Sequence, residues 1–359
     1  MKILIVVAAD LLDTNGTTIR AQRVSNMIDA QFDVRLLGYS KSRANLPKAK
    51  LLALLPYWLV RLICTLLGNK FDCIYLCHDR YGFIIAKVLQ AVCRYKIIYE
   101  AHAVVSEEIE GMGKSSLSIK FMRYLESFIA RHSNYVVALS QNTFEFFSKR
   151  TANVELIPVF LDTDHYKFNE VERVKVRRHY GIDNILIGLI GPFDTPFNKY
   201  YLSFLENNLD KFDKRIKFMV IGRCAMNIQS SKVIYVGYVE NYIDYLSSLD
   251  CVIIPSKVPT GGPLNKIIEA MSLSLPVFTT PQGMVGLYYI QPGKDIFVFE
   301  ERELATKLSE IVFYRELMKT VGDNGHFAVE NYYSEEANKR KLVALISETV
   351  QAERRNAQT

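Results

Sequence analysis

Residues 251–271 read Cys-Val-Ile-Ile-Pro-Ser-Lys-Val-Pro-Thr-Gly-Gly-Pro-Leu-Asn-Lys-Ile-Ile-Glu-Ala-Met. The apolar run 251–254 is typical of a strand covered on both faces. Leu264, Ile267, Ile268 and Met271 recur at helical spacing and predict a helix with one buried face. Pro263 suits the first helical position, where its missing N–H costs nothing. A strand, a glycine-rich loop and a helix in this order predict one unit of a parallel α/β sheet.

The same alternation extends over most of the chain. Right-handed crossovers between such strands predict two doubly wound, Rossmann-like domains, over residues 1–165 and 166–333. A polar stretch at 164–178 interrupts the pattern between them, and residues 334–359 read as a closing helix, capped by Ser334, that packs back on the first domain. The expected strands are 3–8, 34–38, 73–77, 96–99, 135–139, 154–159, 185–191, 217–222, 233–237, 251–255, 276–280 and 295–299. The expected helices are 18–30, 47–67, 82–94, 116–131, 141–149, 200–209, 242–249, 264–273 and 302–321.

Composition excludes several classes of protein. Of the 359 residues, 49% are hydrophobic and 23% charged, which excludes a disordered chain, a collagen-like repeat and a disulfide mini-scaffold. Lys and Arg exceed Asp and Glu by six, too thin an excess for a dedicated nucleic-acid binder. The six cysteines form no Cys-x-x-Cys pair, and the first residues lack the pattern of a signal peptide. We therefore expect a cytoplasmic protein.

One apolar segment, residues 51–67, has two interpretations. Pro56 and Arg61 interrupt a run too short to span a membrane. It reads as a helix buried against the first sheet or as an interfacial helix, and the two can coexist. The interfacial reading rests on Lys48 and Lys50, which precede the segment, and on Tyr57 and Trp58, residue types that favour headgroup depth. The second interpretation predicts peripheral association with the anionic inner membrane face.

The glycine-rich loop predicts an anion site. Free backbone N–H groups around Gly261 and Gly262, with the positive end of the helix dipole, favour a phosphate or diphosphate, and Lys257 and Lys266 add charge. Asn265 and Glu269 share the opposite helix face, where a carboxylate can accept hydrogen bonds from sugar hydroxyls. The structural alternative is an ordinary loop and a solvated glutamate.

Polar residues also follow the strands of the first half. His102 stands at the end of one strand, His78 and Asp79 at the end of the preceding one, and Gly16 follows the first strand, where a glycine lets backbone approach a ligand. Each has a structural alternative, as a satisfied histidine or a helix cap. No His-Glu-x-x-His motif is present and no constellation of metal ligands stands out, so neither a metal nor another cofactor is expected.

These motifs resemble glycosyltransferase family 4. The segment from Gly261 to Met271 is similar to the donor-binding signature of that family, and Tyr99-Glu100-Ala101-His102 is similar to its N-terminal histidine motif. The resemblance implies the GT-B fold, with two domains facing a cleft. It also implies a retaining enzyme that moves a sugar from a nucleoside diphosphate sugar to a glycan or lipid-linked acceptor in cell-surface polysaccharide synthesis.

The resemblance assigns roles to individual residues. It makes His102 and Glu269 catalytic, with Glu269 at the nucleotide ribose, and puts the acceptor near His78 and Asp79. It implies a donor site made of Gly16, Lys199, Arg223, Thr260, Gly261, Gly262, Asn265, Lys266 and Glu269. The chain departs from the family at Gly261, where the family has a glutamate, and at Asn198, where arginine is commoner. An epimerase or phosphorylase on the same scaffold, and a non-catalytic nucleotide-sugar-binding protein, therefore stay as alternatives.

Overall fold

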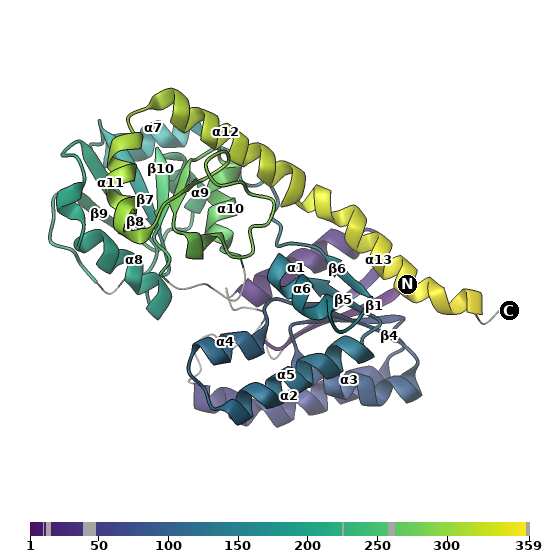
Figure 1. Ribbon diagram of the computed structural model, residues 1–359. Coiled ribbons are helices and arrows are strands. Elements are labelled where there is room, and N and C mark those ends of the chain that lie inside the picture. The colour runs from purple at the N-terminus through teal and green to yellow at the C-terminus, as the bar shows by residue number, and fades with distance from the viewer. Residues whose placement is uncertain (10, 12–15, 39–47, 225, 258–262, 357–359) are drawn as a thin grey trace. The chain divides into compact units, whose positions relative to one another are not determined.

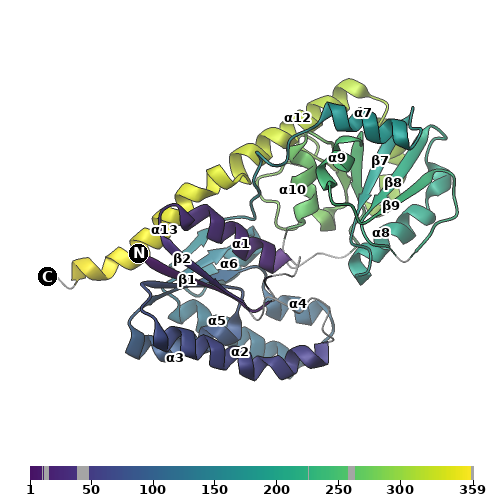
Figure 2. The ribbon, with the colours of Figure 1, turned by 180° about the vertical axis from the view of Figure 1, so that it is seen from behind.

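The computed structural model describes residues 1–9, 11, 16–38, 48–224, 226–257 and 263–356, with 48–55, 196–197 and 352–356 described as backbone only. The chain divides into two compact units (Figures 1 and 2). The first contains Met1–Val159 and the C-terminal residues from Asn338, and the second contains Phe160–Ala337. Each unit has a parallel six-stranded sheet, so the predicted α/β class with two doubly wound sheets is confirmed.

The first sheet has the strand order β2-β1-β3-β4-β5-β6. Because β1 has β2 on one side and β3 on the other, its carboxyl end lies where the winding direction changes. The strands are β1 (Lys2–Val7), β2 (Asp33–Leu37), β3 (Cys73–Cys77), β4 (Lys96–Ala101), β5 (Tyr135–Ala138) and β6 (Val154–Leu156). The helices are α1 (Gly16–Asp29), α2 (Lys48–Gly68), α3 (Arg80–Cys93), α4 (Val105–Gly111), α5 (Ser116–His132), α6 (Gln141–Ser148) and α13 (Glu335–Asn356).

Helices α2, α3 and α5 cover one face of this sheet (Figure 1). Trp58 of α2, Phe83 of α3 and Ile129 of α5 are fully buried in one apolar cluster with Leu4 and Leu76 of the sheet. The interpretation of residues 51–67 as a buried helix is therefore confirmed for its inner face. The expectation that Trp58 lies at headgroup depth is wrong, because its indole fills the core. None of the described helices is long and apolar enough to cross a membrane.

The second sheet has the order β12-β11-β10-β7-β8-β9 and changes direction between β7 and β10. Its strands are β7 (Ile185–Ile190), β8 (Ile216–Ile221), β9 (Val233–Gly237), β10 (Cys251–Ile254), β11 (Val277–Thr279) and β12 (Phe297–Val298). The α-helices are α7 (Glu170–His179), α8 (Pro196–Glu206), α9 (Tyr242–Ser247), α10 (Asn265–Ser272), α11 (Glu301–Ile311) and α12 (Arg315–Tyr332). Two short 3₁₀ turns are η1 (Leu209–Lys211) and η2 (Pro281–Met284).

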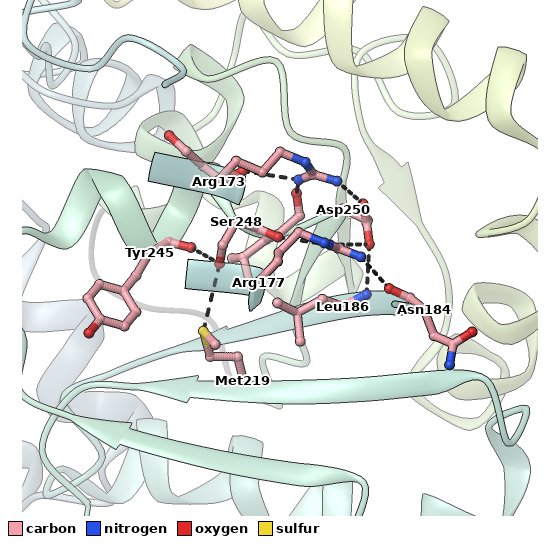
Figure 3. A network of polar contacts seen from close by, with 10 residues as sticks. Arg173, Arg177, Asn184, Leu186, Met219, Tyr245, Ser248 and Asp250 are labelled. Carbon is pink, nitrogen blue, oxygen red and sulfur yellow. Dashed lines mark hydrogen bonds and ion pairs between the residues drawn. The ribbon is translucent and has the colours of Figure 1, made fainter. Parts of the chain in front are cut away.

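Ion pairs attach α7 to the amino ends of two strands (Figure 3). Arg173 and Arg177 both donate to the carboxylate of Asp250, which also accepts the backbone N–H of Leu186 at 2.7 Å. The sequence predicted only a polar interruption here, and that is wrong for residues 170–179. The helix has no buried residue and hence no apolar stripe to reveal it.

Other element boundaries also differ from the prediction. The single helix expected at 302–321 is two helices, α11 and α12, and no proline or glycine marks the break. Helix α4, which follows His102, has no counterpart among the predicted helices, and Glu107 and Glu108 in its first turn suit the helix dipole. Helix α10 begins at Asn265, after Pro263. The predicted cap at Ser334 is confirmed, since its hydroxyl accepts the N–H of Ala337 at 3.2 Å.

Candidate active-site residues

The carboxyl edge of the second sheet brings backbone segments unusually close together. Gly191 follows β7, Gly222 follows β8, and Gly237 ends β9. Gly222 has φ of +125°, and a Cβ there would lie 3.0 Å from the Cα of Gly191. Glycine at both positions therefore allows the loops after β7 and β8 to pack against each other. This edge is where doubly wound sheets bind ligands.

Lys266 connects the two strands at the change of winding direction. Its Nζ donates to the carbonyl oxygen of Ile190 at 2.9 Å and to Oδ1 of Asn198 at 3.1 Å, and it lies 4.8 Å from the centre of the Tyr201 ring. Burial lowers the pKa of Lys266 to about 8, against the opposing effect of nearby Glu269. Lys266 thus attaches α10, which follows β10, to β7 and α8.

Asn198 is positioned as firmly as Lys266. Its Nδ2 donates to the carbonyl oxygen of Pro192 at 2.6 Å, and its Oδ1 accepts from Lys266. The residue that departs from the family pattern therefore connects the loop after β7 to α10. The sequence offered no signal for this pairing, because the two residues are 68 positions apart.

Glu269 lies one turn after Asn265 on α10 and is half-buried. The hydroxyl of Tyr242, from α9, donates to Oε2 of Glu269 at 3.4 Å. Burial, and then the negative charge of Glu269, raises the pKa of Tyr242 well above its ordinary value, so the phenol keeps its proton. Tyr242 is a neighbour of the predicted site that sequence reasoning missed.

The remaining predicted donor residues are less closely assembled. Lys199 is exposed in the first turn of α8, and Arg223 is exposed 3.9 Å from the carboxylate of Asp194. Lys257 lies 5.2 Å from the ring centre of Tyr200, whose hydroxyl donates to Glu301 of α11. The predicted donor residues Thr260, Gly261 and Gly262 lie outside the described residues.

In the first unit, Glu100 is the centre of a buried polar cluster. Its Oε2 accepts from Nε and Nη2 of Arg20 at 3.0 and 2.9 Å and from the hydroxyl of Tyr75 at 2.6 Å. Nε2 of His102 lies 2.8 Å from Oε1. Burial alone would raise the pKa of Glu100, but Arg20 and His102 outweigh burial and hold it well below its ordinary range. Glu100 is therefore an ionised carboxylate that orients the imidazole of His102.

His78 lies beside His102. The two rings stack with centres 5.1 Å apart, and Nδ1 of His78 accepts the backbone N–H of His102 at 3.2 Å. Burial, His102 and Arg80 all lower the pKa of His78 well below its ordinary value, so the ring is neutral. Nη1 of Arg80 lies 3.3 Å from Nε2 of the same ring, so both nitrogens of His78 face N–H donors.

The other two predicted residues of the first unit lie at helix starts. Asp79 is buried and caps α3, with Oδ1 accepting the N–H of Gly82 at 2.8 Å. Gly16 is the exposed first residue of α1. The structure therefore brings together His78, His102 and Glu100 in the first unit, and Lys266, Asn198 and Glu269 in the second.

A family model matches part of the second unit. Residues 184–312, from just before β7 to just after α11, match the family model described as glycosyl transferases group 1. The resemblance to glycosyltransferases is thus confirmed for this part of the chain. No curated protein matches the chain in sequence.

Solved structures show the fold. HepE of Anabaena in complex with UDP is 16% identical, with 97% of this chain and 100% of that chain covered and a TM-score of 0.76. Sucrose-phosphate synthase of Thermosynechococcus elongatus is 14% identical, with 98% and 99% covered and a TM-score of 0.79. The lipopolysaccharide outer core galactosyltransferase WaaB is 13% identical, with 98% and 100% covered and a TM-score of 0.63. The predicted GT-B fold is confirmed.

Proposed function

We propose that this protein is a retaining glycosyltransferase that moves a sugar from a nucleoside diphosphate sugar to a glycan or lipid-linked acceptor in cell-surface polysaccharide synthesis. The observation that carries this proposal is the family match over residues 184–312, because it contains the whole assembly of Lys266, Asn198 and Glu269. HepE, which shares the fold, has also been solved with UDP-glucose, a donor of the class proposed here.

The donor would bind at the carboxyl edge of the second sheet. Two of the three N–H donors of the Lys266 ammonium bond to Ile190 and Asn198, and the third could take a diphosphate oxygen near the start of α10. Glu269, one turn further along, would accept the ribose hydroxyls. Lys199 and Arg223 are exposed and could move onto the diphosphate. With these cations at the donor and His102 at the acceptor, the proposed reaction uses neither a metal nor another cofactor.

His102 would act on the acceptor side. Retention through an oxocarbenium-like state needs groups that orient hydroxyls near the sugar, while the leaving phosphate can take the acceptor proton. Glu100 holds Nε2 of the His102 imidazole by a hydrogen bond, so the ring is oriented before a substrate binds. His78, as a neutral ring stacked on His102, would support that orientation.

A lipid-linked acceptor would require the protein to work at the cytoplasmic face of a membrane. The outer side of α2 supports this part of the proposal. Tyr57 and Val60 are exposed there.

The decisive experiment measures donor binding and turnover. Thermal shift against UDP-, GDP- and ADP-sugars identifies the donor, because a bound ligand raises stability by mass action. We then expect Glu269→Ala to reduce kcat/KM for that donor by about 100-fold or more, because the ribose loses a charged acceptor. The matched control is Glu303→Ala, which removes an exposed glutamate from α11. Normal turnover by Glu269→Ala, with the control also normal, would contradict the ribose assignment.

The same assay separates the alternatives. A transferase consumes donor only when an acceptor is present and forms a product that contains both. Donor consumption without any acceptor would favour an epimerase, and consumption that requires inorganic phosphate would favour a phosphorylase. Tight donor binding without turnover over a broad acceptor panel would favour a non-catalytic nucleotide-sugar-binding protein.

A further inference from the structure

The outer surface of α2, α3 and α5 is unusually apolar. Ten of the 21 large hydrophobic side chains that the described part of the chain exposes lie on these three helices. They recur at helical spacing, so each helix carries a stripe that points away from the sheet. The stripes are Tyr57, Val60 and Leu67 on α2, Tyr81, Ile84, Val88 and Val92 on α3, and Leu117, Phe121 and Tyr124 on α5.

The stripes form one surface, because the three helices lie side by side. Helix α3 contacts both α2 and α5, and the inner faces of all three share one core cluster (Figures 1 and 2). Val88 and Val92, on the middle helix, have exposed fractions of 69% and 74%, so they contribute little to the core. Leu117 at 77% and Tyr124 at 71% extend the surface along α5. Monomeric proteins rarely leave so many neighbouring apolar side chains in water without a use for them.

The charged residues of these three helices are almost all basic, and one of them, Arg123, pairs with Glu110 of the neighbouring α4 at 3.0 Å. The sequences of α2, α3 and α5 contain eight Lys and Arg residues and one acidic residue, Glu126. Glu126 is buried, and its Oε1 accepts the backbone N–H of Val105 at 2.6 Å. These helices therefore carry an excess of seven basic residues, whereas the whole chain has an excess of six. The rest of the chain has one acidic residue more than it has basic ones.

We propose that this three-helix surface docks onto an anionic lipid bilayer. Amphipathic helices that combine an apolar face with basic residues lie in the membrane interface, and tyrosines favour headgroup depth. A second copy of the chain fits less well, because two such surfaces would bring like charges together. The proposal extends membrane association from α2 alone to α3 and α5. It concerns a surface that would bind lipid whether or not the chain transfers sugar.

The test is co-sedimentation of the full-length protein with large unilamellar vesicles. Vesicles of phosphatidylcholine alone are compared with vesicles that contain about 30% phosphatidylglycerol, at about 50 mM and about 500 mM salt. We expect binding to the anionic vesicles at low salt, weaker binding at high salt, and little binding to phosphatidylcholine. Failure of the unchanged protein to bind anionic vesicles at low salt would overturn the proposal.

Paired variants locate the surface. Val88→Glu/Val92→Glu should weaken vesicle binding at least about tenfold, because it puts two negative charges at the centre of the apolar stripe. The matched control, Val171→Glu/Val174→Glu, places two glutamates at exposed valines of α7 in the other unit and should change binding less than about twofold. A second variant, Lys120→Ala/Arg131→Ala, removes charge only and should reduce the salt-dependent part of binding.

Two further measurements distinguish a loss of lipid binding from a folding defect or a loss of the proposed enzyme function. Thermal unfolding and donor binding, which depends on the second unit, should be the same in all variants, so that a folding defect or a failure of the proposed enzyme function is recognised independently. Equal binding by Val88→Glu/Val92→Glu and the unchanged protein would refute the docking surface. A dimer in solution that this variant dissociates, without vesicle binding by the unchanged protein, would assign the surface to a second copy instead.

Discussion

Replacing Glu100 by Gln tests whether the buried ion pair holds the first unit together. Glu100 is fully buried, and its Oε2 accepts from Arg20 and Tyr75 while His102 bonds to Oε1. The Gln amide keeps the shape and one acceptor oxygen but removes the negative charge that the buried Arg20 guanidinium contacts at 2.9 Å. Removing one partner of a buried ion pair costs about 3–5 kcal/mol. For a unit of this size, that corresponds to a fall in Tm of about 6–20 °C.

The pH dependence gives a second measure of the same interaction. The pKa of Glu100 in the folded protein lies below its ordinary value of 4.5. The ion pair therefore contributes its full stability above about pH 4.5, and that contribution is lost as the pH falls through the folded pKa. The difference in unfolding free energy between the unchanged protein and Glu100→Gln should be constant near neutral pH and should shrink below pH 4.5.

Urea unfolding, followed by circular dichroism, measures these differences. The matched control is Glu126→Gln, a buried glutamate hydrogen-bonded to backbone N–H groups, and we expect it to cost about 1 kcal/mol. The double variant Arg20→Met/Glu100→Gln should recover at least half of the loss, because it also removes the buried cation that has lost the Glu100 carboxylate. Equal costs for the two glutamate variants, or no recovery in the double variant, would refute the ion-pair explanation.

Three further predictions concern the second unit. The pKa of Lys266 falls from 10.5 to about 8 on folding, so the charged amine destabilises the folded state below pH 8. Relative to Lys266→Met, the unfolding free energy of the unchanged protein should rise by up to about 3 kcal/mol between pH 8 and 10.5. A difference in urea unfolding between the two proteins that does not vary with pH would contradict this. Gly222→Ala should lower the unfolding free energy by about 1–3 kcal/mol in the same assay, because only glycine readily adopts its φ of +125° and the new Cβ would press on Gly191. The control Gly237→Ala has open space at its Cβ and therefore measures the backbone cost alone. Asp250→Asn should destabilise the protein by about 2–4 kcal/mol, because Arg173 and Arg177 lose their shared carboxylate; an unchanged denaturation midpoint would show that α7 is held by other contacts.

Much of the fold follows from local patterns. Every predicted strand is present, with ends that differ from the prediction by at most three residues. A buried parallel strand is a short apolar run, which can be recognised without knowledge of its neighbours. The helix after β10 was also predicted, since Ile267, Ile268 and Met271 form its buried stripe. Sequence reasoning did not predict α7, because ion pairs hold this helix in place and its sequence has no apolar periodicity.

The candidate sites divide in the same way. The sequence by itself determined two doubly wound units, the strand end that His102 follows and the helix that carries Lys266 and Glu269, because these positions follow from the alternation of strands and helices. Only the tertiary structure decided that Arg20 neutralises Glu100 from 80 residues away and that Asn198 holds Lys266 from 68 residues away. It also decided that Trp58 lies in the core while Val88 and Val92 face outward. Periodicity specifies which side of an element is apolar, but the partner of a charge depends on how distant elements pack.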